Sequence, residues 1–220
     1  MLEENANKLV SPGRGILAAD ESTGTMSSRL QGVGVDPSEE ARRSYRANLF
    51  ATPGCEAAVS GVILFDETIR QMMDDGTPIP DYMVAQDILP GIKVDTGAHP
   101  LANHDGEKIT EGLDGLRTRC IEYFNMGARF AKWRAVITIA DGIPSQACIS
   151  ANAHALARYS AICQEQGLVP IIEPEVLMNG NHDAARCYSV TAEILAATFA
   201  ACEDQGVHIP GALLKPNMII

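Results

Sequence analysis

The feature that most constrains the fold is a repeated order of helix, glycine and apolar strand in the second half of the chain. Amphipathic stretches near 110–126, 145–166 and 182–205 each end at a glycine, and an apolar run soon follows each one. The glycines are Gly127, Gly167 and Gly206. Glycine readily adopts the left-handed conformation that ends many helices, so we predict it at the C′ position of each helix. The repeat of about forty residues has the scale of a βαβ unit.

The first half of the chain contains similar elements in a less regular order. We predict helices at 1–10, 36–50 and 66–73, and strands at 16–19, 59–65 and 90–95. The second helix is predicted to begin at Asp36 as N-cap, with Pro37 in the first helical position and Glu39 three residues after the cap. The segment after residue 95, rich in Gly, His and Asn, is predicted to be a loop.

Apolar strands that alternate with amphipathic helices indicate a parallel sheet covered by helices. Such a sheet is either doubly wound and open or closed as a (β/α)₈ barrel. No G-x-G-x-x-G or P-loop motif occurs, since Gly32-Val33-Gly34 lacks the third glycine. Charged residues stand instead on several different strands, which is typical of the active-site end of a barrel. We therefore predict an α/β fold of the TIM barrel type, with residues 1–220 forming a single domain.

Seven charged residues stand on or just after the predicted strands, and four of them form two pairs on single strands. The seven are Asp20, Lys93, Lys132, Arg134, Glu173, Glu175 and Lys215. Because residues i and i+2 of a strand share a face, Lys132 lies beside Arg134 and Glu173 beside Glu175. Each pair alone is explained by a salt bridge at a strand end. Buried parallel strands rarely tolerate uncompensated charge, so the whole set favours one shared site.

Lys215 lies inside the apolar run Ala212–Met218 and allows two interpretations. A lysine between Leu214 and Pro216 can extend its ammonium out to solvent from the end of a strand. Alternatively, desolvation disfavours the charged form, and the neutral amine can attack a carbonyl to form a Schiff base. The charged residues on the other strands favour the second interpretation.

Composition excludes several classes of partner. The net charge is −11 and the pI about 4.8, which argues against nucleic acid or an anionic membrane surface. An anionic substrate would therefore need a local positive pocket. No apolar run approaches the ~18 residues of a membrane span, and the N-terminus lacks the pattern of a signal peptide. The six cysteines are widely spaced and His99 and His104 form no ligand cluster, so we expect reduced thiols, a cytoplasmic location, no metal site and no cofactor.

Five segments resemble the strand motifs of class I fructose-bisphosphate aldolases, in the order of that family and through essentially the whole chain. They are Gly15–Gly24, Gly91–Asp95, Phe130–Arg134, Ile172–Glu175 and Leu214–Met218. The resemblance implies a metal-independent lyase on a (β/α)₈ barrel. It implies reversible cleavage of fructose 1,6-bisphosphate to dihydroxyacetone phosphate and glyceraldehyde 3-phosphate in glycolysis and gluconeogenesis. It also implies a homotetramer with a phosphorylated sugar as substrate.

The resemblance assigns roles to the catalytic residues. Lys215 corresponds to the amine that forms the iminium, and Glu173 to the general acid/base for carbinolamine dehydration, with Glu175 beside it. Asp20 corresponds to the carboxylate that handles the substrate hydroxyl during cleavage. Lys132 corresponds to a cation near the Schiff-base lysine that holds substrate oxygens.

The resemblance also implies a substrate-binding set. Lys93 and Arg134 correspond to cations on the phosphate side, a role that the charge of an acidic protein also demands for a bisphosphate. Ser22 corresponds to a hydroxyl that contacts phosphate. Thr25 stands where many members have serine, and Thr96 replaces a common lysine; we expect little effect on the chemistry from either.

The chain departs from the family pattern by ending five residues past Lys215. We expect about six of the eight βα units of a barrel, with edges at Ile16–Ala19 and Leu213–Met218. The two further units carry the family's other phosphate site, rich in Gly and Arg, and a C-terminal tyrosine follows them. The chain is then a fragment, a chain completed by a partner, or a non-catalytic remnant. We expect weak stability and little activity for these 220 residues alone, and metal-independent cleavage by the longer protein.

A second Schiff-base lyase of the barrel class, such as a transaldolase-like or deoxyribose-phosphate-type enzyme, is the alternative enzyme. Such an enzyme would share one catalytic lysine. It would not share the pair Glu173 and Glu175 on one strand or the Lys132-Trp133-Arg134 strand, so the sequence favours the aldolase.

Overall fold

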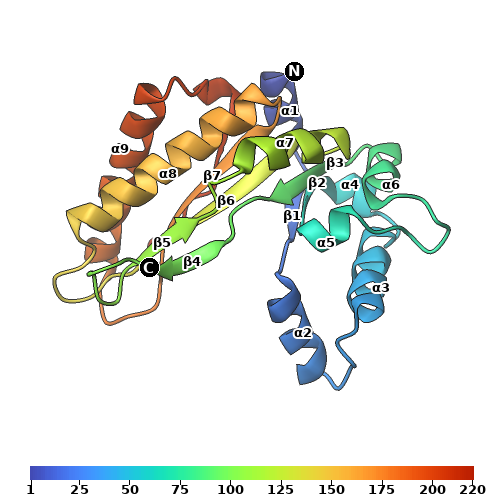
Figure 1. Ribbon diagram of the computed structural model, residues 1–220, viewed down its shortest axis with the longest axis horizontal. Helices are drawn as coiled ribbons and strands as arrows, with labels where there is room; N and C mark the ends of the chain where they lie inside the picture. Colours follow the sequence, from blue (N-terminus) through green and yellow to red (C-terminus); the bar gives the residue numbers. More distant parts are fainter.

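The computed structural model describes residues 1–220 and is built on a six-stranded sheet (Figure 1). The strands are β1 (Gly15–Ala19), β2 (Val59–Leu64), β3 (Leu89–Lys93), β6 (Phe130–Ile137), β7 (Val169–Val176) and β8 (Leu213–Leu214). They are all parallel and lie in the order β1-β2-β3-β6-β7-β8, so each strand pairs with the strand of this sheet that follows it in the chain. The sheet is open in this chain, with β1 and β8 as edges. The predicted barrel type, with about six units present, is confirmed.

The helices are α1 (Leu2–Leu9), α2 (Thr23–Gly32), α3 (Glu39–Phe50), α4 (Cys55–Ala58), α5 (Asp66–Ile69), α6 (Ile79–Ala85), α7 (Leu116–Asn125), α8 (Gln146–Glu165), α9 (Ala184–Asp204) and the 3₁₀ helix η1 (Ile209–Gly211). Helix α1 precedes the first strand and packs on the inner face, whereas most of the others follow a strand and pack on the outer face. The long helices α8 and α9 run side by side, whereas α2 and α3 project from the other end of the sheet (Figure 1). None of the helices is long and apolar enough to cross a lipid bilayer.

The glycine prediction is confirmed at all three helix ends. Gly127, Gly167 and Gly206 have φ of +103°, +78° and +67°, and each lies just beyond α7, α8 or α9. These values fall in the region that disfavours side chains with a Cβ atom. The sequence therefore specifies where each of these helices stops and the chain returns toward the sheet.

The local structure differs from the prediction at six points. Helix α2 and helix α6 were not predicted, and the predicted loop after residue 95 contains the antiparallel hairpin of β4 (Gly97–Pro100) and β5 (Lys108–Glu111). The helix expected near 110–126 therefore begins only at Leu116. The N-cap of α3 is Ser38, not Asp36, because the Ser38 hydroxyl accepts the N–H of Ala41 at 3.1 Å. Lys215 lies just past β8, although its N–H still donates to Ile172 O at 2.9 Å.

The outer face of the sheet carries the largest part of the core. Trp133 of β6 and Tyr159 of α8 are fully buried there, and their rings stack with centroids 5.5 Å apart. The Tyr159 hydroxyl lies 2.8 Å from Ala131 O and 3.0 Å from Ile171 O, so it bridges β6 and β7.

The inner face is apolar near the amino ends of the strands, where α1 closes it. Ala6 and Leu9 of α1 pack with four strand residues, Ile63, Phe130, Val169 and Ile171. The Ser60 hydroxyl donates to Leu9 O at 2.6 Å and ties α1 to β2. A Cβ atom on Gly91 would lie 2.2 Å from the Phe130 ring, so glycine is what allows this aromatic side chain to lie across β3.

Candidate active site

The strand register brings the predicted charges together on the inner face, above the apolar layer. Lys93 of β3 is the register partner of Lys132 of β6, and Arg134 is the register partner of Glu173 of β7. Since alternate residues share a face, Phe130, Lys132 and Arg134 rise along one strand from the apolar layer to solvent. The side chains therefore form layers, as expected at the carboxyl-end mouth of a barrel.

Lys132 lies at the centre of the charged layer. Its side chain is 7% exposed, and its Nζ lies 2.7 Å from Asp20 Oδ2 and 3.7 Å from Glu173 Oε2. Burial alone would lower the pKa of Lys132, but the negative charges of Asp20 and Glu173 outweigh it, and the pKa is raised above its ordinary value. Lys132 is therefore a permanent cation at neutral pH.

Glu173 lies between two amines. Its Oε1 accepts a hydrogen bond from Lys215 Nζ at 2.5 Å, and its Oε2 faces Lys132 without any hydrogen-bond partner. The Glu173 side chain is 5% exposed, whereas the Lys215 side chain is 51% exposed at the β8 edge. A buried carboxylate oxygen without a partner is unusual, because desolvation without a hydrogen bond is costly. Glu173 therefore has one oxygen paired with Lys215 and one that no hydrogen bond occupies.

Two further ion pairs lie toward the mouth. Lys93 Nζ donates to the carboxylate of Asp95 and, at 2.7 Å, to Asp95 O. Arg134 Nε donates to Glu175, and the Arg134 side chain is 44% exposed. Burial lowers the pKa of Arg134, but its hydrogen bond to Glu175 reverses the effect and raises that pKa. Lys93 and Arg134 both line the open pocket described next.

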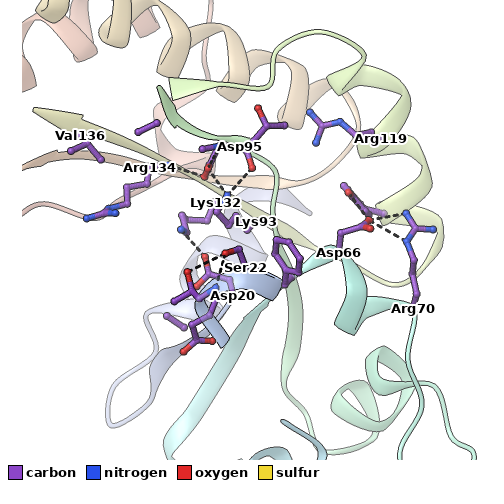
Figure 2. A pocket seen from close by; sticks show the side chains of 18 of the residues that line it. Asp20, Ser22, Asp66, Arg70, Lys93, Asp95, Arg119, Lys132, Arg134 and Val136 are labelled. Atoms are coloured by element: carbon purple, nitrogen blue, oxygen red, sulfur yellow. Dashed lines mark hydrogen bonds and ion pairs between the residues drawn. The ribbon is translucent and has the colours of Figure 1, made fainter. Parts of the chain in front are cut away.

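A pocket of about 1000 Å³ opens over this layer (Figure 2). Six of the predicted site residues line it: Asp20, Ser22, Thr25, Lys93, Lys132 and Arg134. The Ser22 and Thr25 hydroxyls lie 3.1 Å apart at the start of α2, where the Ser22 hydroxyl also accepts the Thr25 N–H. Glu173, Glu175 and Lys215 are not part of the pocket wall. They lie toward the β8 edge, and Lys132 connects the two parts because it contacts both Asp20 and Glu173.

The structure adds polar residues that sequence reasoning did not single out for the site. Asp95 follows β3 with its side chain only 3% exposed, and the two-residue spacing from Lys93 could have identified it. Arg119 of α7 lines the pocket and donates to Val94 O at 2.8 Å and Gly112 O at 2.5 Å. Because Arg119 belongs to a helix and not to a strand, the pattern of charged strand residues did not indicate it.

Arg46 of α3 is also fully buried behind the segment that carries the predicted Asp20. Its guanidinium donates to Glu21 O at 2.6 Å and to the Thr68 hydroxyl at 2.8 Å. Burial is the main cause that lowers the pKa of Arg46, against the charge of Glu21. In the sequence Arg46 looks like part of the polar face of a helix, so it was not identified.

The remaining candidate ligands form no cluster. All six cysteines are free, and no group of three or more His, Cys, Asp or Glu side chains has an arrangement suited to a metal ion. His99 belongs to β4, and His104 lies in the turn of the hairpin, where its Nδ1 is 2.9 Å from Ala102 O.

Comparisons with known proteins point to one family. The family model of class-I fructose-bisphosphate aldolase, the glycolytic family, matches residues 1–220. A probable class 1 fructose-bisphosphate aldolase of Xanthomonas campestris pv. campestris is 57% identical over 219 residues, 100% of this chain and 66% of the relative. A cytosolic fructose-bisphosphate aldolase of Arabidopsis thaliana is 54% identical over 98% of this chain and 60% of its own.

A solved structure gives the same result. Fructose-bisphosphate aldolase from Plasmodium falciparum, crystallised with TRAP and a small-molecule inhibitor, superposes with a TM-score of 0.97 at 47% identity. The match covers 99% of this chain and 63% of that chain. The chain thus spans roughly 60 to 66% of the length of these relatives.

Proposed function

Because the chain belongs to the class-I fructose-bisphosphate aldolase family, we propose that it carries the Schiff-base centre of a fructose 1,6-bisphosphate aldolase. The reaction is the reversible, metal-independent cleavage of the sugar bisphosphate to dihydroxyacetone phosphate and glyceraldehyde 3-phosphate. The observation that carries the proposal is the position of Glu173 between the amines of Lys215 and Lys132.

This position suits the formation of an iminium. The neutral Nζ of Lys215 adds to the ketone carbon, so a C–N bond forms and the carbonyl becomes a carbinolamine hydroxyl. That hydroxyl leaves as water after it receives a proton from the Glu173 carboxyl group, and a protonated Schiff base remains. Two observations support this role: Glu173 Oε1 lies 2.5 Å from Lys215 Nζ, and Glu173 Oε2 has no hydrogen-bond partner. Glu175, two residues along β7, faces the same side and pairs with Arg134.

Cleavage of the carbon–carbon bond then needs a base and an electron sink. We assign the base to Asp20, which takes the proton of the C4 hydroxyl while the C3–C4 bond breaks and its electron pair moves toward the iminium nitrogen. Lys132 holds Asp20 at 2.7 Å and keeps its own positive charge because its pKa is raised. A fixed cation beside the reacting oxygens stabilises the negative charge that develops on them.

The phosphate side of the pocket is assigned to two cations and two hydroxyls. Lys93 and Arg134 line the pocket, as do Ser22 and Thr25 at the start of α2. In a protein of net charge −11, these local cations supply the field that a phosphorylated sugar requires. A phosphate group competes with Asp95 and Glu175 for these cations, since both are already paired.

Borohydride trapping tests the proposal on the 220-residue chain. Dihydroxyacetone phosphate with borohydride should give an adduct that peptide mass mapping places on Lys215. In Lys215→Met we expect the adduct to fall at least about a hundredfold, because no other amine lies beside Glu173 in an open position. Lys108→Met is the matched control, since Lys108 is exposed on β5 and has no carboxylate partner; it should trap like the parent. An adduct elsewhere, or none in a folded chain, contradicts the proposal.

Three properties of the whole protein complete the proposal. Cleavage should be insensitive to EDTA, since each proton transfer is assigned to a side chain. We further propose a homotetramer, on the resemblance to the family, and a cytosolic location, on the name of the Arabidopsis relative. Sedimentation analysis and cell fractionation measure these two properties.

A further inference from the structure

Two lysines of the pocket lie next to each other on the inner face of the sheet. Lys93 and Lys132 are register partners on β3 and β6. Like charges directly opposite each other on neighbouring strands repel and destabilise the pair. Lys132 has two carboxylates, Asp20 and Glu173, and Lys93 needs an anion of its own if it is not to compete for them.

Asp95 supplies that anion. Its side chain is 3% exposed, and its carboxylate accepts from Lys93 Nζ, which also donates to Asp95 O at 2.7 Å (Figure 2). The backbone N–H of Gly97 donates to Asp95 Oδ1 at 3.2 Å, and the N–H of Arg134 donates to Asp95 Oδ2 at 3.3 Å. Two backbone donors, from β4 and β6, thus hold the carboxylate of Asp95 in place. The longer and more flexible side chain of Lys93 therefore adapts its position to Asp95.

We propose that Asp95 is a positioning residue that holds Lys93 on the phosphate side of the pocket and keeps it away from Asp20. The proposal rests on the proposed function, because it gives Asp95 a part in the binding of the phosphorylated substrate. Without Asp95, Lys93 would be left to compete with Lys132 for the carboxylate of Asp20, which lines the same pocket. Asp95 therefore separates the residue that binds phosphate from those that form and cleave bonds.

The reactivity of Lys93 tests the positioning role without any need for turnover. Reductive methylation followed by peptide mass spectrometry gives the labelling rate of Lys93 relative to that of exposed Lys108 in the same sample. In Asp95→Asn we expect this ratio to rise about tenfold, because the amine loses the negative charge of its ion pair and keeps only neutral oxygen acceptors. Asp66→Asn is the matched control: Asp66 lines the same pocket but pairs with Arg70, so the ratio should stay as in the parent.

Trapping at Lys215 tests the link to substrate binding. In Asp95→Asn, the concentration of dihydroxyacetone phosphate needed for half-maximal trapping should rise about tenfold, while the maximal adduct stays within twofold. Lys93→Met should show the same shift, and the double variant no more than either single one, because both changes remove one interaction. Asp95→Glu keeps the charge and should recover part of the affinity.

The outcomes separate the two proposals. An unchanged Lys93 labelling ratio in folded Asp95→Asn, or additive shifts in the double variant, overturns the positioning role. If Asp95→Asn does not fold, Lys93→Met/Asp95→Asn removes both charges, and a half-maximal concentration above that of Lys93→Met also overturns it. If the parent shows no adduct at Lys215, the proposed function fails, while the Lys93 labelling ratio still reports on Asp95.

Discussion

The two ends of the inner face obey different physical rules although the same strands form both. On β6, Phe130 is fully buried against α1, whereas Arg134, four residues later on the same face, has a side chain 44% exposed. Between them lies Lys132, buried but surrounded by carboxylates. The amino end of the face is thus held by close packing, and the carboxyl end by pairing of opposite charges. Stability and chemistry can therefore be changed separately along a single strand.

The largest effect should come from the apolar end. Phe130→Ala should lower the free energy of unfolding by about 4 kcal/mol, because it removes a fully buried ring and leaves a cavity under α1. Arg134→Ala is the matched variant on the same strand and face. It should cost less than about 1 kcal/mol, since its ion pair is half exposed and screened by solvent. Urea unfolding measures both, and equal losses would remove the distinction between the ends.

A smaller effect should follow from crowding the same apolar end. Gly91→Ala should destabilise the chain by about 2 kcal/mol, because the added methyl group meets the Phe130 ring at 2.2 Å. Phe130→Leu in the same chain should relieve much of this loss, so the two changes should not be additive. Gly15→Ala is the control, since nothing lies within 4 Å of its Cβ position. Additive losses would show that the ring is not what excludes alanine.

The smallest effect concerns the charged end and depends on pH. The pKa of Lys132 in the folded chain is raised, since Asp20 and Glu173 outweigh the opposing effect of burial. The folded state therefore holds this proton more tightly than the unfolded state. The resulting stabilisation is present at neutral pH and is lost as pH rises through the raised pKa, above the ordinary 10.5.

Lys132→Met removes this dependence. The difference in unfolding free energy between the parent and this variant should shrink by about 1 kcal/mol between pH 9 and pH 11. Urea unfolding at several pH values gives the difference, and Lys108→Met supplies the baseline for an exposed lysine. A difference that stays constant over this range would mean that carboxylate pairing does not stabilise Lys132.

The architecture could be predicted from the sequence where a residue type is required by the backbone conformation and the hydrophobic pattern around it is clear. The three glycines that end α7, α8 and α9 are required by positive φ, and the apolar runs after them can only be buried strands. Helix α2 was missed because Thr23–Gly32 has few apolar residues and only Met26 and Leu30 are buried. The β4–β5 hairpin was missed because its two strands are only four residues long, pair with each other and contain no apolar run.

For the candidate site, strand periodicity predicted which charged side chains share a face of the sheet. Alternation placed Lys132 with Arg134, and Glu173 with Glu175, on one face. It could not show that Lys215 lies half exposed past the end of β8, since that depends on where pairing with β7 stops. Nor could it identify Arg46, because burial of an arginine depends on residues that are distant in sequence, such as Glu21 and Thr68.

The phenol of Tyr159 has a consequence for the reacting groups on the opposite side of the sheet. Its hydroxyl lies against the carbonyls of Ala131, the residue before Lys132, and of Ile171, the register partner of Lys132. The spacing between β6 and β7 is therefore constrained from the outer face of the sheet by α8, which lies on the side opposite the pocket. Helix α8 thus helps to set the distance between the amine of Lys132 and the carboxylate of Glu173, through the hydroxyl of one residue that lies outside the site.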